Sequence, residues 1–173
     1  LSSVIVYWNY ESPTCEEMSY LQPNPNLWPD WQDGATFCVS AALADYGLVE
    51  LDDLINPGHK LSFAGWDRSA LIPTDTTTAI HHAAGVEKSI SIESDPLEFQ
   101  GGTLMYVGYW ETGFTAPGSS GSPLFNHEHH VVGVCSGGPP VLCEYSSVYD
   151  PSYSRFSDAW SLLGAGDSYL SDW

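Results

Sequence analysis

Short apolar and aromatic stretches alternate with polar turn segments along the chain, a pattern typical of all-β sandwiches and barrels. β-Branched and aromatic residues favour strands, and where they cluster the sequence predicts strands at residues 4–8, 48–51, 61–64, 77–80, 89–92 and 104–109. Residues 122–125 and 131–135 flank a polar segment, so we expect them to form a hairpin. The predicted fold class is therefore all-β.

Turn residues and weak helix signals complete this picture. Residues 22–34 predict a loop, because they combine three prolines with several Asn and Asp residues. Residues 41–46 are short for a helix, and residues 158–163 favour one or two helical turns. The turn Asn56-Pro57-Gly58 marks the expected boundary between two halves, residues 1–57 and 58–173.

Length and composition indicate a folded chain. The chain has 173 residues, of which 43% are hydrophobic, a content that argues against disorder. A chain of this size buries about 70% of its unfolded surface. No apolar run approaches the roughly 18 residues of a membrane-spanning helix.

The charge is strongly acidic, with 22 Asp and Glu residues against four Lys and Arg and a formal net charge of −18. This balance excludes nucleic acid as a partner, because phosphate binding is driven by Lys and Arg. An anionic membrane surface is disfavoured for the same reason. Neutral or cationic substrates fit better. We expect a monomer without a cofactor.

The cysteines and a histidine cluster bear on metals and disulfides. No cysteine stands in a C-x-x-C pair, so a zinc site has little support. His127, His129 and His130 lie with Glu128 in the expected hairpin turn, where side chains are usually solvated, and we expect no metal site there. Much Trp and Tyr with little Lys suggests an extracellular protein, a compartment that permits disulfides. Three disulfide pairings are open to the four cysteines, Cys15, Cys38, Cys135 and Cys143.

The segment Gly118-Ser119-Ser120-Gly121-Ser122-Pro123 carries the main chemical signal. Glycines on either side of a serine allow positive φ and close approach of another backbone. Such a turn can aim the amides of Gly118 and Ser120 at one point beside the Ser120 hydroxyl, the geometry of an oxyanion hole next to a nucleophile. The alternative is a Gly- and Ser-rich loop without chemistry.

With the following hairpin and Ser136-Gly137-Gly138, the chain resembles the trypsin-like serine proteases, and specifically the bacterial lysyl endopeptidases. The matching segments occur in the same order and cover most of the chain: 3–10, 45–51, 64–68, 79–82, 87–91, 117–123 and 137–139. The resemblance implies an all-β fold of two six-stranded antiparallel barrels with few helices. Residues 1–57 would be the remainder of an incomplete N-terminal barrel, and residues 58–173 the C-terminal barrel.

The resemblance also implies roles for single residues. Ser120 would be the nucleophile, and Asp45 the acid that orients a histidine; the alternative for Asp45 is a surface residue near a strand start. The amides of Gly118 and Ser120 would hold the oxyanion. Ser119 stands where trypsin has an Asp, so the activation ion pair of trypsin is not expected.

For substrate binding, the resemblance implies that Ser136, Gly137 and Gly138 pair with the substrate backbone as an added strand. Phe114 stands where trypsin has the acid of its specificity pocket, six residues before the nucleophile. In the lysyl branch the acid comes later in the chain, and Asp150 is the candidate. The alternative for Asp150 is a loop residue in a common Asp-Pro turn.

The histidine base is the part that the chain lacks. In the family it precedes the stretch that matches residues 3–10, so we interpret the chain as a fragment that is inactive alone. His81 and His82 match a non-catalytic pair, of which we expect one packed and one exposed. The family partners of Cys15 and Cys143 also lie upstream, and Cys38 and Cys135 either pair or stay free.

The sequence thus predicts a secreted bacterial serine endopeptidase that acts by Ser-His-Asp acyl transfer on peptide or protein substrates with a basic, Lys-like P1 residue. One alternative is a catalytically dead, protease-like binding module. Another is a metal- or cation-binding surface protein that uses its acids and its histidine cluster. The acid-rich surface has a further interpretation as an adaptation to a salty habitat.

Overall fold

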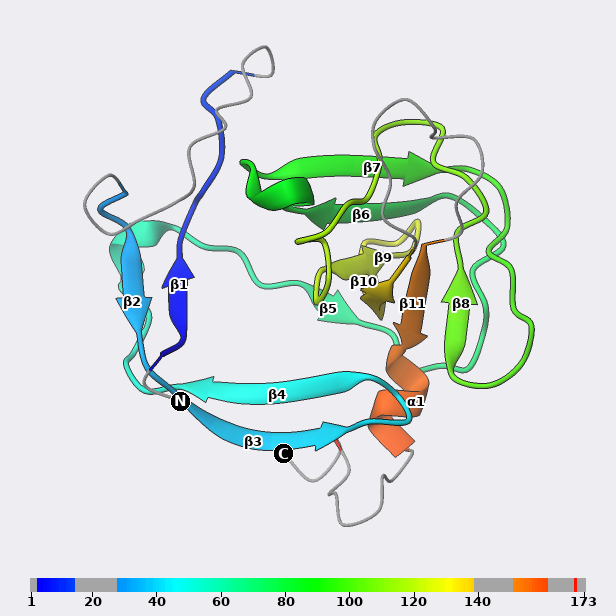
Figure 1. The fold of residues 1–173 in the computed structure, drawn as a ribbon, viewed down its shortest axis with the longest axis horizontal. Helices are drawn as coiled ribbons and strands as arrows, with labels where there is room; N and C mark the ends of the chain where they lie inside the picture. Colours follow the sequence, from blue (N-terminus) through cyan, green and yellow to red (C-terminus); the bar gives the residue numbers. More distant parts are fainter. Residues whose placement is uncertain (1–2, 15–27, 139–150, 162–169, 171–173) are drawn as a thin grey trace.

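A computed structural model describes residues 3–14, 28–138, 151–161 and 170, and confirms the all-β class (Figure 1). The first strands form two small antiparallel sheets. β1 (Ile5–Tyr7) pairs with β2 (Trp31–Asp33), and β3 (Ala35–Ala41) pairs with β4 (Tyr46–Leu51). In the described ranges α1 (Phe156–Ser161) is the only α-helix, and none of their helices has the length and apolarity that crossing a membrane requires.

All later strands join one seven-stranded sheet with the order β7-β6-β9-β10-β11-β8, in which β5 also pairs with β10. The hairpin predicted from the sequence is confirmed, because β9 and β10 pair antiparallel across the turn between them. The strands are β5 (Gly65–Trp66), β6 (Thr77–His81), β7 (Ser89–Glu93), β8 (Leu104–Tyr106), β9 (Pro123–Phe125), β10 (His130–Gly137) and β11 (Ser152–Arg155).

The two ends of this sheet approach each other at one point. Ile92 of β7 and Thr112, which follows β8, exchange two backbone hydrogen bonds with N–O distances of 2.9 and 3.1 Å. The described strands form no closed barrel. This bridge curves the sheet, so that the chain after β8 runs beside β7 before it reaches Ser120.

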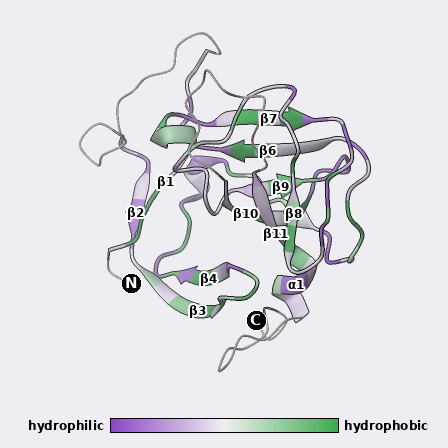
Figure 2. Ribbon diagram, turned by 45° about the vertical axis from the view of Figure 1, so that its right-hand side comes forward, coloured by the Kyte–Doolittle hydropathy of each residue, from purple (hydrophilic) through white to green (hydrophobic). Residues whose placement is uncertain are grey.

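The core lies inside this curved sheet. Met105, Leu124 and Tyr153 come from β8, β9 and β11 and are at most 1% exposed. Tyr153 packs edge-on against Trp110, with ring centroids 6.3 Å apart. Full burial of one such side chain contributes about 1.5–3 kcal/mol. Figure 2 shows hydrophobic residues on β9 and on parts of β6 and β7. Those of β9 include the buried Leu124, whereas Ile80 of β6 and Ile90 of β7 are 38% and 50% exposed.

The tip of the β3–β4 hairpin is docked onto the large sheet. The Thr103 hydroxyl donates to the Leu43 carbonyl at 2.8 Å, and the Ser154 hydroxyl donates to the Asp45 carbonyl at 3.4 Å. Asp45 itself has a φ of 44°, in the left-handed region. These contacts bring a residue of the first small sheets next to β10 and β11.

Several element predictions were wrong or incomplete. β2 lies inside the predicted loop 22–34, because Trp31–Asp33 pairs with β1. The strand predicted at 61–64 does not form. Instead the short strand β5 begins one residue later, at Gly65, beside β10. Residues 42–45 form the turn between β3 and β4, which agrees with the weakness of the helix signal at 41–46. The helix predicted at 158–163 begins earlier, at Phe156. β3 and β11 were not predicted, and the division at residue 57 stays a prediction.

Candidate active site

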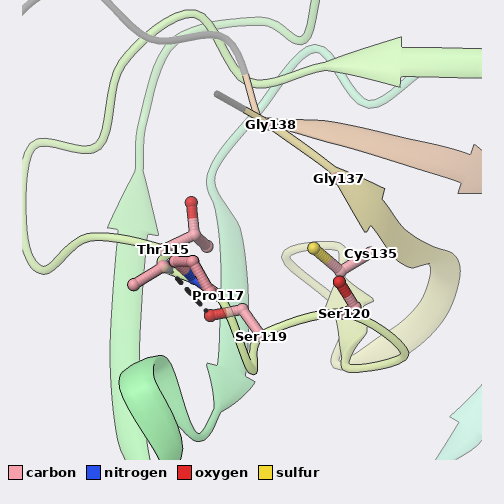
Figure 3. A pocket seen from close by; sticks show the side chains of 8 residues that line it. Thr115, Pro117, Ser119, Ser120, Cys135, Gly137 and Gly138 are labelled. Carbon is pink, nitrogen blue, oxygen red and sulfur yellow. Dashed lines mark hydrogen bonds between the residues drawn. The ribbon is translucent and has the colours of Figure 1, made fainter. Parts of the chain in front are cut away.

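The segment before Ser120 is a tight turn held by Ser119. The Ser119 amide donates to the Ala116 carbonyl at 2.9 Å, and the Ala116 amide donates to Ser119 Oγ at 3.1 Å. Ser119 is 1% exposed, whereas Ser120 is exposed. In Figure 3 the Ser119 hydroxyl points back to the Ala116 amide, while the Ser120 side chain lies on the other side of the turn. The turn therefore buries one serine and presents the next.

Backbone amides around Ser120 fall into two groups. Those of Ser119, Gly121 and Ser122 donate to carbonyls at 2.8–3.1 Å. Those of Gly118 and Ser120 make no hydrogen bond within the part of the chain that the structure describes. Two amides without a partner, one on the exposed serine and one two residues before it, are the donors that an oxyanion hole requires.

Gly118 fits its place because it lacks a side chain. Its φ is 103°, and a Cβ there would lie 3.0 Å from the His82 carbonyl oxygen and 3.1 Å from the Gly85 nitrogen. The Ala84 amide also donates to the Pro117 carbonyl at 2.8 Å. The turn that carries Ser120 thus rests directly on the turn at 82–85, and only glycine tolerates both the angle and the approach.

A cavity of about 230 Å³ opens beside Ser120 (Figure 3). Burial raises the pKa of the Cys135 thiol on its wall, although contacts with Tyr153 and Ser122 act in the opposite direction, so the thiol stays protonated at neutral pH. Gly137 and Gly138 form another part of the wall, where β10 ends. The cavity is lined by Thr115, Ala116, Pro117, Ser119, Ser120, Cys135, Gly137 and Gly138.

Asp45 is connected to the cavity wall by a hydrogen bond with Ser136. The Ser136 hydroxyl donates a short hydrogen bond to the Asp45 carboxylate. Ser136 directly precedes Gly137, which lines the cavity. The structure therefore brings Asp45 and Ser136 together. Sequence reasoning had placed Ser136 only with the substrate and missed this contact.

Asp150 lies outside the described residues, as do Cys15 and Cys143. In the described part Cys38 and Cys135 are both free and do not pair with each other. The described residues hold no group of three or more His, Cys, Asp or Glu side chains placed to bind a metal ion.

His81 and His82 differ in burial and in their hydrogen-bond partners. His81 is 2% exposed, with Nδ1 2.9 Å from Ser119 Oγ and Nε2 2.9 Å from Ser91 Oγ. Desolvation by burial, with a smaller contribution from His82, lowers the pKa of His81 to about 4, so its imidazole is neutral at pH 7. His82 is half-buried instead of exposed: its Nδ1 donates to the Val86 carbonyl at 2.9 Å, and its ring stacks on Tyr10.

The other histidines lie away from Ser120. His59 has Nδ1 3.7 Å from an Asp30 carboxylate oxygen, and His130 has Nδ1 3.7 Å from one of Glu128. His127 and His129 are exposed in the turn between β9 and β10. Within the described residues, no histidine makes a hydrogen bond or ion pair with Ser120 or Asp45.

The chain is similar to known proteins in sequence and in structure. The sequence profile of a family described as "Lysyl endopeptidase, C-terminal domain" matches residues 1–153. A solved structure of a Glu endopeptidase in complex with MPD aligns with a TM-score of 0.48 and 16% identity. That alignment covers 71% of this chain and 59% of the other, so the chain spans less than two thirds of the solved protein.

Proposed function

Since the chain belongs to the lysyl endopeptidase C-terminal domain family and is thereby related to serine proteases, we propose that it carries the nucleophile of a serine endopeptidase. The observation that carries the proposal is the exposed Ser120 beside two unpartnered amides, its own and that of Gly118. In an acyl transfer, the hydroxyl gives its proton to a base and attacks a peptide carbonyl, and the amides bind the resulting oxyanion. The C–N bond then breaks, the amine leaves with the proton, and water hydrolyses the acyl ester to release the acid and restore the serine.

Asp45 is the proposed acid of the triad. A carboxylate in this role orients a histidine and stabilises its protonated form. The donated hydrogen bond from Ser136 supports this role, because it holds the carboxylate at the end of β10 beside the cavity wall. The family resemblance supports a histidine as the base, and no described histidine makes a hydrogen bond or ion pair with Ser120 or Asp45.

Substrate binding is proposed at the end of β10. Gly137 and Gly138 line the cavity and lack side chains, so an extended peptide can approach their backbone as an added strand. The family resemblance supports a basic P1 residue with Asp150 as its acidic partner. It also supports secretion from a bacterial cell.

The test uses the complete gene product that contains these residues, incubated with a fluorophosphonate probe that labels activated serines. We expect a single adduct at Ser120, located by mass spectrometry of peptides, and its loss in Ser120→Ala. Ser94→Ala is the matched control, because Ser94 is also exposed and lies outside the cavity. A folded protein without label at Ser120 would contradict the proposal and favour a protease-like binding module.

A further inference from the structure

A chain of buried hydrogen bonds runs from β7 to the turn that carries Ser120. It joins Ser91 of β7, His81 of β6 and Ser119 of the turn, with 2.9 Å at each contact of the imidazole. None of the three side chains is more than 2% exposed. The Ala116 amide donates to Ser119 Oγ at the far end. Three polar groups inside an apolar sheet are costly to bury unless each is satisfied, and here each has a partner.

The two nitrogens of the His81 imidazole contact different elements. Nδ1 forms a hydrogen bond with Ser119 of the turn, and Nε2 forms one with Ser91 of the sheet. A neutral imidazole has one N–H donor and one acceptor nitrogen, and a hydroxyl serves either, so both contacts form in either tautomer. His81 therefore fixes the position of Ser119 relative to a rigid strand.

Ser119 in turn fixes the direction of the Gly118 and Ser120 amides, which have no hydrogen-bond partner among the described residues. Its amide and its hydroxyl both bind Ala116 and close the turn. Gly118 stands inside that turn and Ser120 follows it directly. A rotation of the Ser119 side chain away from His81 would open the turn and redirect the amides of its two neighbours in the chain.

We propose that His81 is a positioning residue for the nucleophile turn, holding the Gly118 and Ser120 amides in place through Nδ1 and Ser119. This inference rests on the proposed function of Ser120. His81 does not touch substrate or the reacting atoms. Its Nε2 contact with Ser91 serves the sheet and contributes little to the site.

Two pairs of variants separate the two nitrogens. The carboxamide of an asparagine reaches about as far as Nδ1, and that of a glutamine about as far as Nε2. His81→Asn thus keeps a partner for Ser119, whereas His81→Gln keeps a partner for Ser91. Ser119→Ala and Ser91→Ala form the second pair, since both remove one buried hydroxyl from the same imidazole and only Ser119 belongs to the turn.

The experiment measures two quantities on the complete gene product: the rate of fluorophosphonate labelling at Ser120 and hydrogen exchange in peptides that span residues 116–122, which leave out Gly113 because it packs on Ser91. We expect His81→Gln and Ser119→Ala to label about tenfold more slowly, the loss that one hydrogen bond accounts for. Both should exchange faster in 116–122. His81→Asn and Ser91→Ala should stay within about twofold of the unmodified protein, although their melting temperatures fall as well.

Equal losses in both members of either pair would overturn the inference, because a purely structural role does not distinguish the two nitrogens. If the probe does not label Ser120 in the unmodified protein, the proposed function is wrong, and hydrogen exchange alone tests the positioning role of His81. Faster exchange limited to His81→Gln and Ser119→Ala would still support that role. Unchanged exchange in those two variants would refute it.

Discussion

Ser136 and Asp45 are 91 positions apart in the sequence, yet the hydroxyl of one donates to the carboxylate of the other. The contact links the tip of the β3–β4 hairpin to the end of β10. Among the described residues it is the one side-chain hydrogen bond between the proposed acid and the strand proposed to bind substrate. The direction of the Asp45 carboxylate therefore depends on a residue of the large sheet.

Removal of this donor should lower activity without unfolding the protein. In the complete gene product, Ser136→Ala leaves the Asp45 carboxylate without its hydroxyl partner, and hydrogen bonds to charged groups are among the stronger ones. We expect kcat/KM on a peptide ester to fall on the order of tenfold to a hundredfold. Ser94→Ala is the control, because Ser94 donates to the Glu111 carboxylate at 2.6 Å on an exposed surface. Equal effects of the two substitutions would contradict the role of Ser136.

Stability should fall in acid because His81 is buried in its neutral form. Its pKa is about 4 in the folded chain against 6.5 in the unfolded chain. Between these values only the unfolded chain binds the proton, so the free energy of unfolding falls as the pH falls from 6.5 to 4. The loss is about 3 kcal/mol when both pKa values have been passed.

Urea unfolding at a series of pH values measures this loss. In His81→Asn the group that titrates is gone, and the slope of unfolding free energy against pH between 6.5 and 4 should be shallower by up to one proton. The groups closest to His81 are the Ser91 and Ser119 hydroxyls and the His82 imidazole, and the asparagine variant retains all of them. An unchanged slope would show that His81 does not carry this effect.

Gly118→Ala should be far more damaging than an alanine at another left-handed glycine. Both Gly118 and Gly101 have positive φ, 103° and 90°, but a Cβ at Gly101 meets nothing within 4 Å. Gly101→Ala therefore reports backbone strain alone, about 1–2 kcal/mol. Gly118→Ala adds contact with the His82 carbonyl, which should lower the melting temperature further and abolish labelling at Ser120. Thermal unfolding and labelling of both variants provide the comparison.

Leu124→Ala should destabilise the large sheet without altering the site directly. Leu124 is fully buried in β9, and loss of its side chain leaves a cavity that costs about 2–5 kcal/mol. Leu71→Ala is the control, since Leu71 is 80% exposed and should stay within about 0.5 kcal/mol of the parent. Chemical denaturation measures both changes. A similar loss in the two variants would argue against the core described above.

Local sequence pattern was sufficient where an element is marked by its own residues. The β9–β10 hairpin was predicted from two apolar runs around a polar turn, and the strand at Thr77–His81 from its β-branched residues. β3 was missed although it contains Thr36, Phe37 and Val39, because Ala, Cys and Ser separate and flank these strand formers and the pattern lacks a clear apolar run. β5 has two residues and forms only because β10 lies beside it.

In the site, too, local sequence pattern predicts the turn but not the contacts between residues that are far apart in the sequence. The turn around Ser120 was predictable, since glycines next to serines mark a tight turn in the sequence. The contacts of His81 with Ser119 and of Asp45 with Ser136 join residues 38 and 91 positions apart, and no periodicity encodes them. The adjacent pair His81-His82 was a signal, and only the fold distinguishes the buried member from the half-buried one.

The docking of the β3–β4 tip has an evolutionary consequence. Thr103, Ser136 and Ser154 each hold one group of the segment 43–45. Thr103 directly precedes β8, Ser136 lies in β10 and Ser154 lies in β11. A gene exchange that joins the first strands of one relative to the sheet of another would separate the tip from its partners. The two parts are therefore expected to be inherited together. Because Thr103 and Ser154 bind backbone carbonyls, which every residue supplies, only a substitution of Asp45 is expected to be matched by one of Ser136.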